Sequence, residues 1–179
     1  MHYRFALVGN PNCGKTTMFN EMTGSTQYVG NWPGVTVEKK EANLLRKYKN
    51  ILPNGRVVDL PGAYSIAPYT SEEAITRDFV LGENPDVIIN IVDASSLERS
   101  LYFTTQLLEL GIPVIVALNK QDLVRRSGTK IDVKGLEEEL KCKIVETVAN
   151  DNVGLKELIE AAAYLAKGKK VQQAPDFIG

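Results

Sequence analysis

One segment near the start of the chain has the residue types and the spacing that bind phosphate groups. The residues Gly9-Asn10-Pro11-Asn12-Cys13-Gly14-Lys15-Thr16 fit the pattern G-x-x-x-x-G-K-[ST] of a P-loop. Its glycines let backbone N–H groups turn toward phosphate oxygens, Lys15 supplies a charge to the β- and γ-phosphates, and the Thr16 hydroxyl is a magnesium ligand. The alternative is a glycine-rich turn with a chance lysine. The apolar run Phe5-Ala6-Leu7-Val8 before the segment and the helical pattern after it favour the P-loop.

A second phosphate motif follows further along the chain. Asp59-Leu60-Pro61-Gly62 matches D-x-x-G at the end of a predicted strand. The Asp59 carboxylate can hold magnesium through a water, and the Gly62 N–H can meet the γ-phosphate. By itself D-x-x-G is more often a plain turn, but the P-loop upstream favours the phosphate role.

Thr36 lies between these two motifs. A threonine in this place can close on magnesium and the γ-phosphate and then let go after hydrolysis. The alternative is a β-branched residue that merely begins a strand.

Two further segments have the chemistry to recognise guanine. Asn119-Lys120-Gln121-Asp122 follows an apolar strand, and the Asp122 carboxylate can accept from the ring N–H and the exocyclic amine of guanine. Adenine presents the opposite pattern and leaves that carboxylate unpaired. The alternative is a polar N-cap of a helix, but ligands of α/β proteins bind at the carboxyl ends of strands. Thr147-Val148-Ala149 also follows a strand, and the Ala149 N–H is expected to contact the guanine carbonyl oxygen.

The elements that must position these motifs alternate between strands and helices. The predicted strands are 2–8, 35–48, one ending at 57–59, 87–92, 112–118 and 143–146, and the predicted helices are 15–22, 71–81, 96–110, 135–140 and 155–166. This alternation predicts an α/β fold with a six-stranded, mostly parallel sheet and helices on both faces. A turn at Pro53-Asn54-Gly55 makes a hairpin that adds one antiparallel edge strand.

Two stretches have no regular pattern. Residues 25–34 are rich in breakers, and a long loop beside a phosphate site is predicted to be functional. Residues 168–179 lose the helical pattern. The chain is therefore predicted to hold one domain over 1–167, followed by a linker.

Composition limits the possible functions. The formal net charge of -1 and the pI of about 5.9 argue against a general nucleic-acid binder. Cys13 and Cys142 are expected to be free thiols in a reducing compartment. The longest apolar run, 112–118, is far shorter than the roughly 20 residues that span a bilayer, so this fragment is expected to be soluble.

The order of the motifs resembles the Ras-like GTPase superfamily. A narrower resemblance rests on Gly9 to Thr17 and above all on Asn31-Trp32-Pro33-Gly34-Val35-Thr36-Val37-Glu38, and also on Asp59 to Ser65, Asn90 to Ala94 and Leu97-Glu98-Arg99. These stretches are similar to the amino-terminal G domain of FeoB-type ferrous iron transporters. In that family a helical domain and then a polytopic membrane domain follow the G domain.

This resemblance implies a GTP-binding and GTP-hydrolysing switch with GTP or GDP, Mg²⁺ and K⁺ as cofactors. It also implies a location on the cytoplasmic face of the inner membrane. The expected partners are the protein's own helical and transmembrane domains, and no binding of nucleic acid is expected. Whether the protein forms a homo-oligomer is left open. Lys15, Thr36, Gly62 and Asn12 are the predicted catalytic residues, and Thr16, Thr36 and Asp59 the Mg²⁺ ligands. The predicted nucleotide contacts are Gly9, Asn10, Pro11, Asn12, Cys13, Gly14, Lys15, Thr16, Thr17, Asp59, Gly62, Asn119, Lys120, Asp122, Thr147, Val148 and Ala149.

Two positions depart from the usual patterns. The family often has methionine where Lys120 stands, but lysine is the ordinary choice across G proteins, so guanine selectivity is expected to hold. Small G proteins such as Ras usually have serine where Val148 stands. The missing hydroxyl predicts weaker retention of the nucleotide.

A potassium ion is expected to assist hydrolysis. Ras-like enzymes carry a glutamine directly after D-x-x-G, but here that residue is Ala63, and residues 25–34 hold no arginine. The Asn12 carbonyl oxygen can hold a monovalent cation against the phosphates, with backbone carbonyls around Gly30 and Trp32 completing the shell. Cation-dependent GTPases share an asparagine at the matching place. The alternative is that Asn12 only braces the P-loop turn.

A rival function is a GTPase of ribosome or RNA assembly from the same superfamily. Residues 38–56 hold six basic side chains and two acidic ones, which gives this segment a charge of +4. Such a segment can face RNA or an anionic membrane. A charged edge hairpin that resists aggregation is the simpler interpretation and is favoured.

Overall fold

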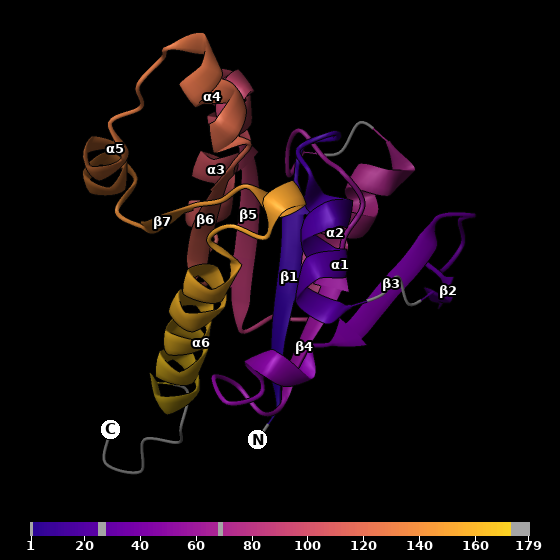
Figure 1. Cartoon of the computed structure of the whole chain (residues 1–179). Coiled ribbons are helices and arrows are strands. Elements are labelled where there is room, and N and C mark those ends of the chain that lie inside the picture. The colour runs from indigo at the N-terminus through magenta and orange to yellow at the C-terminus, as the bar shows by residue number, and fades with distance from the viewer. Residues whose placement is uncertain (1, 25–27, 68–69, 173–179) are drawn as a thin grey trace.

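The computed structural model describes residues 2–24, 28–67 and 70–172, so part of the predicted 25–34 loop and the end of the predicted linker lie outside it. One sheet has the strand order β2-β3-β4-β1-β5-β6-β7 (Figure 1). The strands from β4 to β7 are parallel, while β3 is antiparallel to β4 and to β2. The strands are β1 (Tyr3–Gly9), β2 (Tyr28–Asn31), β3 (Glu38–Asn43), β4 (Gly55–Asp59), β5 (Val87–Asp93), β6 (Val114–Asn119) and β7 (Lys143–Glu146).

Helices cover both faces of this sheet. Alternate residues of β1 face opposite sides: Phe5 and Leu7 pack in the cluster that includes α1 and α6, and Ala6 and Val8 in the cluster that includes α2 and α3. Apolar residues of α4 and α5 pack on β6 through a third cluster. The predicted α/β class is confirmed. The helices are α1 (Lys15–Thr23), α2 (Ser71–Gly82), α3 (Leu97–Leu108), α4 (Gln121–Ser127), α5 (Val133–Leu140) and α6 (Leu155–Gln172).

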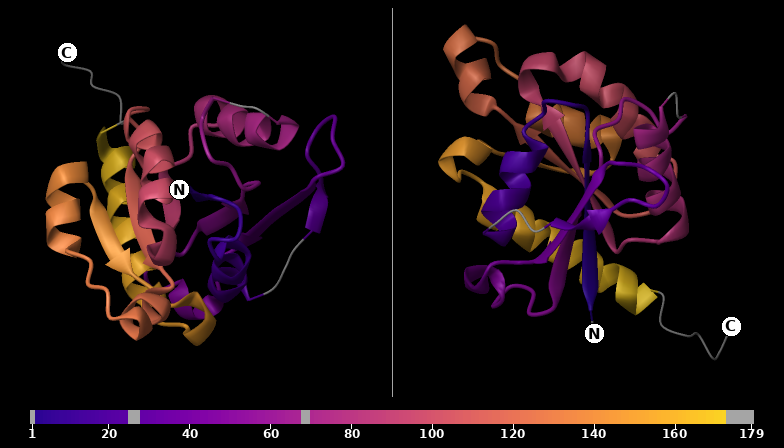
Figure 2. Two further views of the ribbon diagram at one scale, coloured as in Figure 1. Left: turned by 90° about the horizontal axis from the view of Figure 1, so that it is seen from above. Right: turned by 90° about the vertical axis from the view of Figure 1, so that its right-hand side faces the viewer.

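The sheet has seven strands rather than the six expected. The additional strand, β2, lies inside the stretch predicted as a loop and makes the true edge of the sheet. It is only four residues long, Gly30 has a φ of 131°, and its register with β3 shifts between Tyr28 and Gly30. Such a short, irregular strand leaves no alternating pattern in the sequence. The β2–β3 hairpin therefore lies at the opposite edge from β7 (Figure 1, Figure 2).

Three other features differ from the prediction by more than two residues. The strand predicted over 35–48 is β3 alone, followed by a short 3-10 turn at Arg46–Tyr48. The helix α4, which begins directly after Lys120, was not predicted. The helix α6 continues to Gln172, past the expected end near 167, because Gly168 lowers helix stability by only about 1 kcal/mol and does not stop a helix. Within the described residues no helix is long and apolar enough to span a bilayer.

The strand ends bring the predicted motifs together. The parallel strands β1, β4, β5 and β6 all run in one direction, so their carboxyl ends share one edge of the sheet (Figure 1). The P-loop follows β1, Asp59 ends β4, Asp93 ends β5 and Asn119 ends β6. The fold thus brings the predicted phosphate and base motifs to one edge of the sheet, although they are spread over more than one hundred residues of sequence.

Candidate functional site

The P-loop lines a cavity of about 510 Å³ at this edge. Gly14, just before α1, has a φ of 95°, and a Cβ added there would lie 2.4 Å from Nδ2 of Asn119. Both the backbone and the space therefore require glycine at this position. The residues that line the cavity are 10–12, 14–17, Gly62, Glu72, Lys120 and Asn150.

Cys13 does not line this cavity and is 2% exposed. A Cβ added at Gly9 would lie 2.6 Å from its Sγ and 2.7 Å from the Ile91 carbonyl oxygen. Burial raises the pKa of the Cys13 thiol, although Lys15 opposes the shift. The neutral thiol therefore packs as a small apolar group under the loop, and both cysteines are free, as predicted.

Lys15 and Asp59 form a close ion pair at the base of the cavity. Their side chains are 12% and 6% exposed, so the pair is largely shielded from water. A phosphate group that enters the cavity offers Lys15 a second anionic partner. Thr16 lines the same cavity and, with Asp59, supplies the hard oxygen donors that suit Mg²⁺.

The loop after Asp59 is fixed against the P-loop. The Ala63 N–H donates to the Gly9 carbonyl oxygen at 3.0 Å, and the Thr76 hydroxyl of α2 donates to the Pro61 carbonyl oxygen at 2.9 Å. A Cβ added at Gly62 would lie 3.1 to 3.2 Å from atoms of Pro11. Glycine thus allows the two phosphate motifs to approach each other closely.

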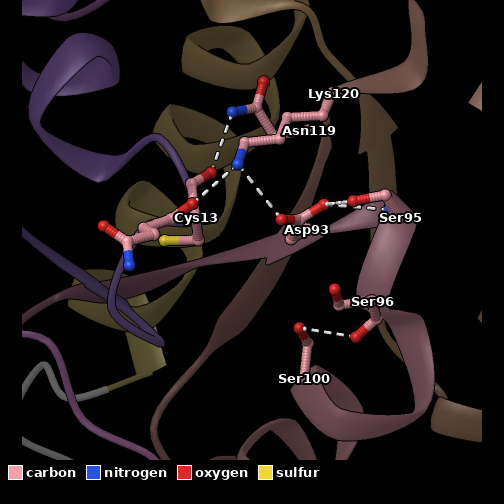
Figure 3. Close-up of polar contacts among 8 residues, drawn as sticks. Cys13, Asp93, Ser95, Ser96, Ser100, Asn119 and Lys120 are labelled. Carbon is pink, nitrogen blue, oxygen red and sulfur yellow. Dashed lines mark hydrogen bonds and ion pairs between the residues drawn. The ribbon is translucent and has the colours of Figure 1, made fainter. Parts of the chain in front are cut away.

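Asn119 joins the P-loop to the 147–149 segment. Its Nδ2 donates to the Cys13 carbonyl oxygen at 3.0 Å (Figure 3). Its Oδ1 accepts from the Thr147 hydroxyl at 3.1 Å and from the Ala149 N–H at 3.0 Å. The Ala149 N–H, predicted to contact guanine, here satisfies a buried acceptor instead. Asn119 is 2% exposed.

Lys120 reaches across to two other segments. Its Nζ donates to the Asn12 carbonyl oxygen at 2.7 Å and to Oδ2 of Asp93 at 3.1 Å (Figure 3). The other oxygen of Asp93 accepts from the Ser95 N–H at 2.9 Å and from the Ser95 hydroxyl at 2.5 Å. Burial alone would raise the pKa of Asp93, but the bonds from Ser95 and Lys120 outweigh it and lower that pKa. Asp93 is therefore ionised at neutral pH.

Sequence reasoning assigned no role to Asp93 or Ser95. One signal could have found Asp93: like Asp59, it stands at the carboxyl end of a buried parallel strand. No spacing rule pairs it with Lys120, because the two residues are 27 positions apart.

Several predicted site residues lie away from the cavity. Trp32 packs edge-on against Phe79, with ring centroids 5.9 Å apart, and the 32–37 turn is closed by a hydrogen bond from the Trp32 N–H to the Val37 carbonyl oxygen at 2.9 Å. Thr36 is exposed within this turn. Thr36, Gly30 and Trp32 do not line the P-loop cavity.

Asp122 and Val148, which were predicted to recognise the base, do not line the cavity. Asp122 is half-buried in the first turn of α4. Val148 is buried, and its N–H donates to the Val153 carbonyl oxygen at 3.1 Å. The structure thus groups the P-loop, Asp59, Gly62 and the segments around Asn119 and Thr147, and it leaves the hairpin residues apart.

The sheet order and the meeting of the P-loop with the Asn119 segment define a P-loop G domain. The family model described as ferrous iron transport protein B matches residues 3–162. The chain belongs to this family.

Known proteins of the family are similar over most of the chain. The Fe(2+) transporter FeoB of Staphylococcus aureus (strain MSSA476) is 43% identical over 164 residues, which make up 92% of this chain and 24% of that protein. The chain thus spans about a quarter of the length of this relative. An NFeoB mutant from S. thermophilus bound to mGDP has a TM-score of 0.87 and 43% identity, over 99% of this chain and 65% of its own. The mGMPPNP-bound NFeoB from S. thermophilus has a TM-score of 0.80 and 46% identity, over 92% and 61%.

Proposed function

We propose that this chain binds GTP and GDP with Mg²⁺ in the P-loop cavity and hydrolyses GTP. The observation that carries the proposal is the buried Asn119 side chain, which joins the P-loop to the 147–149 segment beside the cavity. A phosphate loop alone fits many nucleotides, whereas a segment held against that loop by Asn119 supports recognition of the base as well. The two similar NFeoB structures bind mGDP and mGMPPNP, which supports the same ligand class here.

Different residues of the site are proposed to bind the phosphates, the metal and the base. Lys15 exchanges Asp59 for the β- and γ-phosphates, and the Gly62 N–H donates to the γ-phosphate. Thr16 and Asp59 hold the Mg²⁺, and Thr36 joins them from the hairpin in the triphosphate state. When bound, the metal neutralises charge on the phosphates. Asp122 and the 147–149 segment read the guanine base.

Hydrolysis is proposed to use Asn12 and a potassium ion. Ala63 offers the attacking water no side-chain hydrogen bond, and Asn12 lines the cavity. Of the three residues predicted for potassium, Gly30 and Trp32 lie in the hairpin, so a complete shell requires the hairpin to approach the P-loop.

The domain is proposed to act as the switch of a ferrous iron membrane transporter. Family membership and the FeoB relatives support this role. The G domain, predicted over residues 1–167, then lies on the cytoplasmic face of the membrane. Because α6 continues to Gln172, the segment that leads to helical and transmembrane domains of the longer protein begins after this helix. No observation favours the RNA-assembly alternative.

Competition binding tests the nucleotide assignment. Wild-type protein is titrated with GTP, XTP and ATP, and the Asp122→Asn variant is titrated alongside it. Wild type is expected to prefer GTP, and Asp122→Asn to shift toward XTP, because the amide replaces one acceptor with a donor. Equal affinity of the wild type for ATP and GTP would disprove base recognition by Asp122.

A further inference from the structure

Lys120 connects three segments that are distant in sequence. Its ammonium contacts the main-chain carbonyl of Asn12 in the P-loop and the carboxylate of Asp93 at the end of β5, while Lys120 itself follows β6 (Figure 3). The side chains of Lys120 and Asp93 are 30% and 15% exposed, so water screens this ion pair only in part. We call this arrangement the Asp93–Lys120–Asn12 tie.

The backbone is in an uncommon conformation at two of the three residues of the tie. Asn12 has a φ of 67° and Lys120 a φ of 63°, in the left-handed region that residues other than glycine seldom adopt. Such conformations persist where surrounding contacts hold them. The bond from the Lys120 ammonium to the Asn12 carbonyl is a contact of that kind, and it acts on both loops at once.

The two oxygens of Asp93 have separate tasks. Oδ1 accepts from the N–H and the hydroxyl of Ser95 and closes the short turn at Ala94–Ser96. Oδ2 faces the Lys120 ammonium. The capping of the turn and the hold on Lys120 can therefore be separated by substitution.

We propose that Asp93 is a positioning residue for nucleotide retention, because it holds the Lys120 ammonium on the Asn12 carbonyl and thereby keeps the P-loop and the base-recognition loop in register. Without Asp93, water competes for the ammonium and the two loops move independently, so a nucleotide held by both loops leaves faster. The consequence for nucleotides depends on the proposed function. The tie itself is a property of the protein alone.

Release of fluorescent GDP from four proteins tests the proposal: wild type, Asp93→Asn, Lys120→Met and the double variant. Asp93→Asn retains an oxygen for Ser95 but removes the charge that faces Lys120, and Lys120→Met retains an unbranched chain without the ammonium. Each single variant is expected to release GDP about tenfold faster than wild type, as for the loss of a hydrogen bond to a charged group. The double variant is expected to be no faster than Lys120→Met, because both changes break one tie.

Two results would overturn the proposal: release from Asp93→Asn at the wild-type rate, or effects that multiply in the double variant. Ser95→Ala is the matched control, because it removes one bond to Oδ1 and leaves Oδ2 on Lys120. Its release rate is expected to equal that of wild type. If Ser95→Ala accelerates release as much as Asp93→Asn does, Asp93 acts by capping the turn and not by holding Lys120.

Amide hydrogen exchange at Asn12 to Gly14, measured without added nucleotide, tests the tie without reference to function. Exchange is expected to be faster in Asp93→Asn and Lys120→Met than in wild type and Ser95→Ala. If wild type binds no guanine nucleotide, the proposed function fails, and this exchange still decides whether Asp93 holds the loop. Unchanged exchange in both variants overturns the tie even where nucleotide binding is normal.

Discussion

The two sides of the P-loop cavity differ in how firmly their predicted site residues are attached to the P-loop. On the β6 side, Asn119 and Lys120 are joined to the P-loop by hydrogen bonds of 2.7 to 3.0 Å, and Asn119 is buried while Lys120 is half-buried. On the side of the β2–β3 hairpin, Thr36 is exposed in a turn held by its own backbone and by the packing of Trp32. The groups assigned to binding are thus already assembled, whereas those assigned to the triphosphate state are not. Binding and hydrolysis should therefore respond separately to substitution.

Lys15→Ala is expected to have the largest effect. It removes the charge that is proposed to bind the phosphates, and it leaves the buried Asp59 without its partner. Nucleotide affinity is expected to fall by at least about 100-fold, or two powers of ten in Kd, because charge-assisted contacts to phosphate are strong. Isothermal titration with GDP measures this change. The control Lys156→Ala alters an exposed lysine on α6 and should bind as wild type does; retained affinity in Lys15→Ala would remove Lys15 from the site.

The substitutions Gly14→Ala and Gly34→Ala compare the β6 side and the hairpin side directly. Gly14 and Gly34 both have positive φ, 95° and 78°, so alanine strains the backbone at each by about 1 kcal/mol or slightly more. Only at Gly14 does the new Cβ meet an atom, Asn119 Nδ2 at 2.4 Å, while at Gly34 nothing lies within 4 Å. Gly14→Ala is expected to lower the free energy of unfolding by about 3 kcal/mol and Gly34→Ala by about 1 kcal/mol. Equal losses in urea unfolding would show that the β6 side is not packed as described.

Potassium should stimulate GTP turnover through Asn12. We expect hydrolysis about tenfold faster in potassium than in sodium at equal ionic strength, since the cation is proposed to take the place of an arginine finger. Asn12→Ala is expected to abolish this preference. Asn152→Ala is the matched control: Asn152 also has a left-handed backbone, with a φ of 56°, but does not line the cavity. A potassium preference that survives in Asn12→Ala would assign the ion to other ligands.

Thr36→Ala tests whether the hairpin serves only the triphosphate state. GDP affinity is expected to stay at the wild-type level, whereas GTP hydrolysis should slow by about tenfold, because Thr36 is proposed to engage only the triphosphate state. Thr36→Ser keeps the hydroxyl and should restore most of the rate. Single-turnover hydrolysis and GDP titration, measured on the same samples, separate the two effects. An equal loss of GDP affinity would place Thr36 in the preassembled side of the site.

The sequence predicted the β6 side better than the hairpin side, and the reason is physical. P-loop and Asn119-to-Asp122 motifs follow strongly apolar strands, so local pattern and chemistry agree there. In the hairpin, β2 is short and contains Gly30 at a φ of 131°, which leaves no periodic signal. The contact of Lys120 with Asn12 spans 108 positions, and no local pattern encodes it. The missed features are therefore an irregular edge strand, the short helix α4 after Lys120 and a long-range polar contact.

The smallest expected effect concerns Val148, which is buried and whose N–H and carbonyl oxygen are hydrogen-bonded to Val153. Its side chain carries no hydroxyl to brace the base loop, so GDP is expected to bind with micromolar affinity, about -8 kcal/mol, and to leave quickly. Val148→Ser adds a hydroxyl and should slow GDP release a few-fold, by about the value of one neutral hydrogen bond. Val148→Ala removes the same methyl groups without adding a hydroxyl, so it isolates the effect of lost packing. Stopped-flow release that slows equally in Val148→Ala and Val148→Ser would assign the effect to packing, and wild-type release over hours would contradict weak retention.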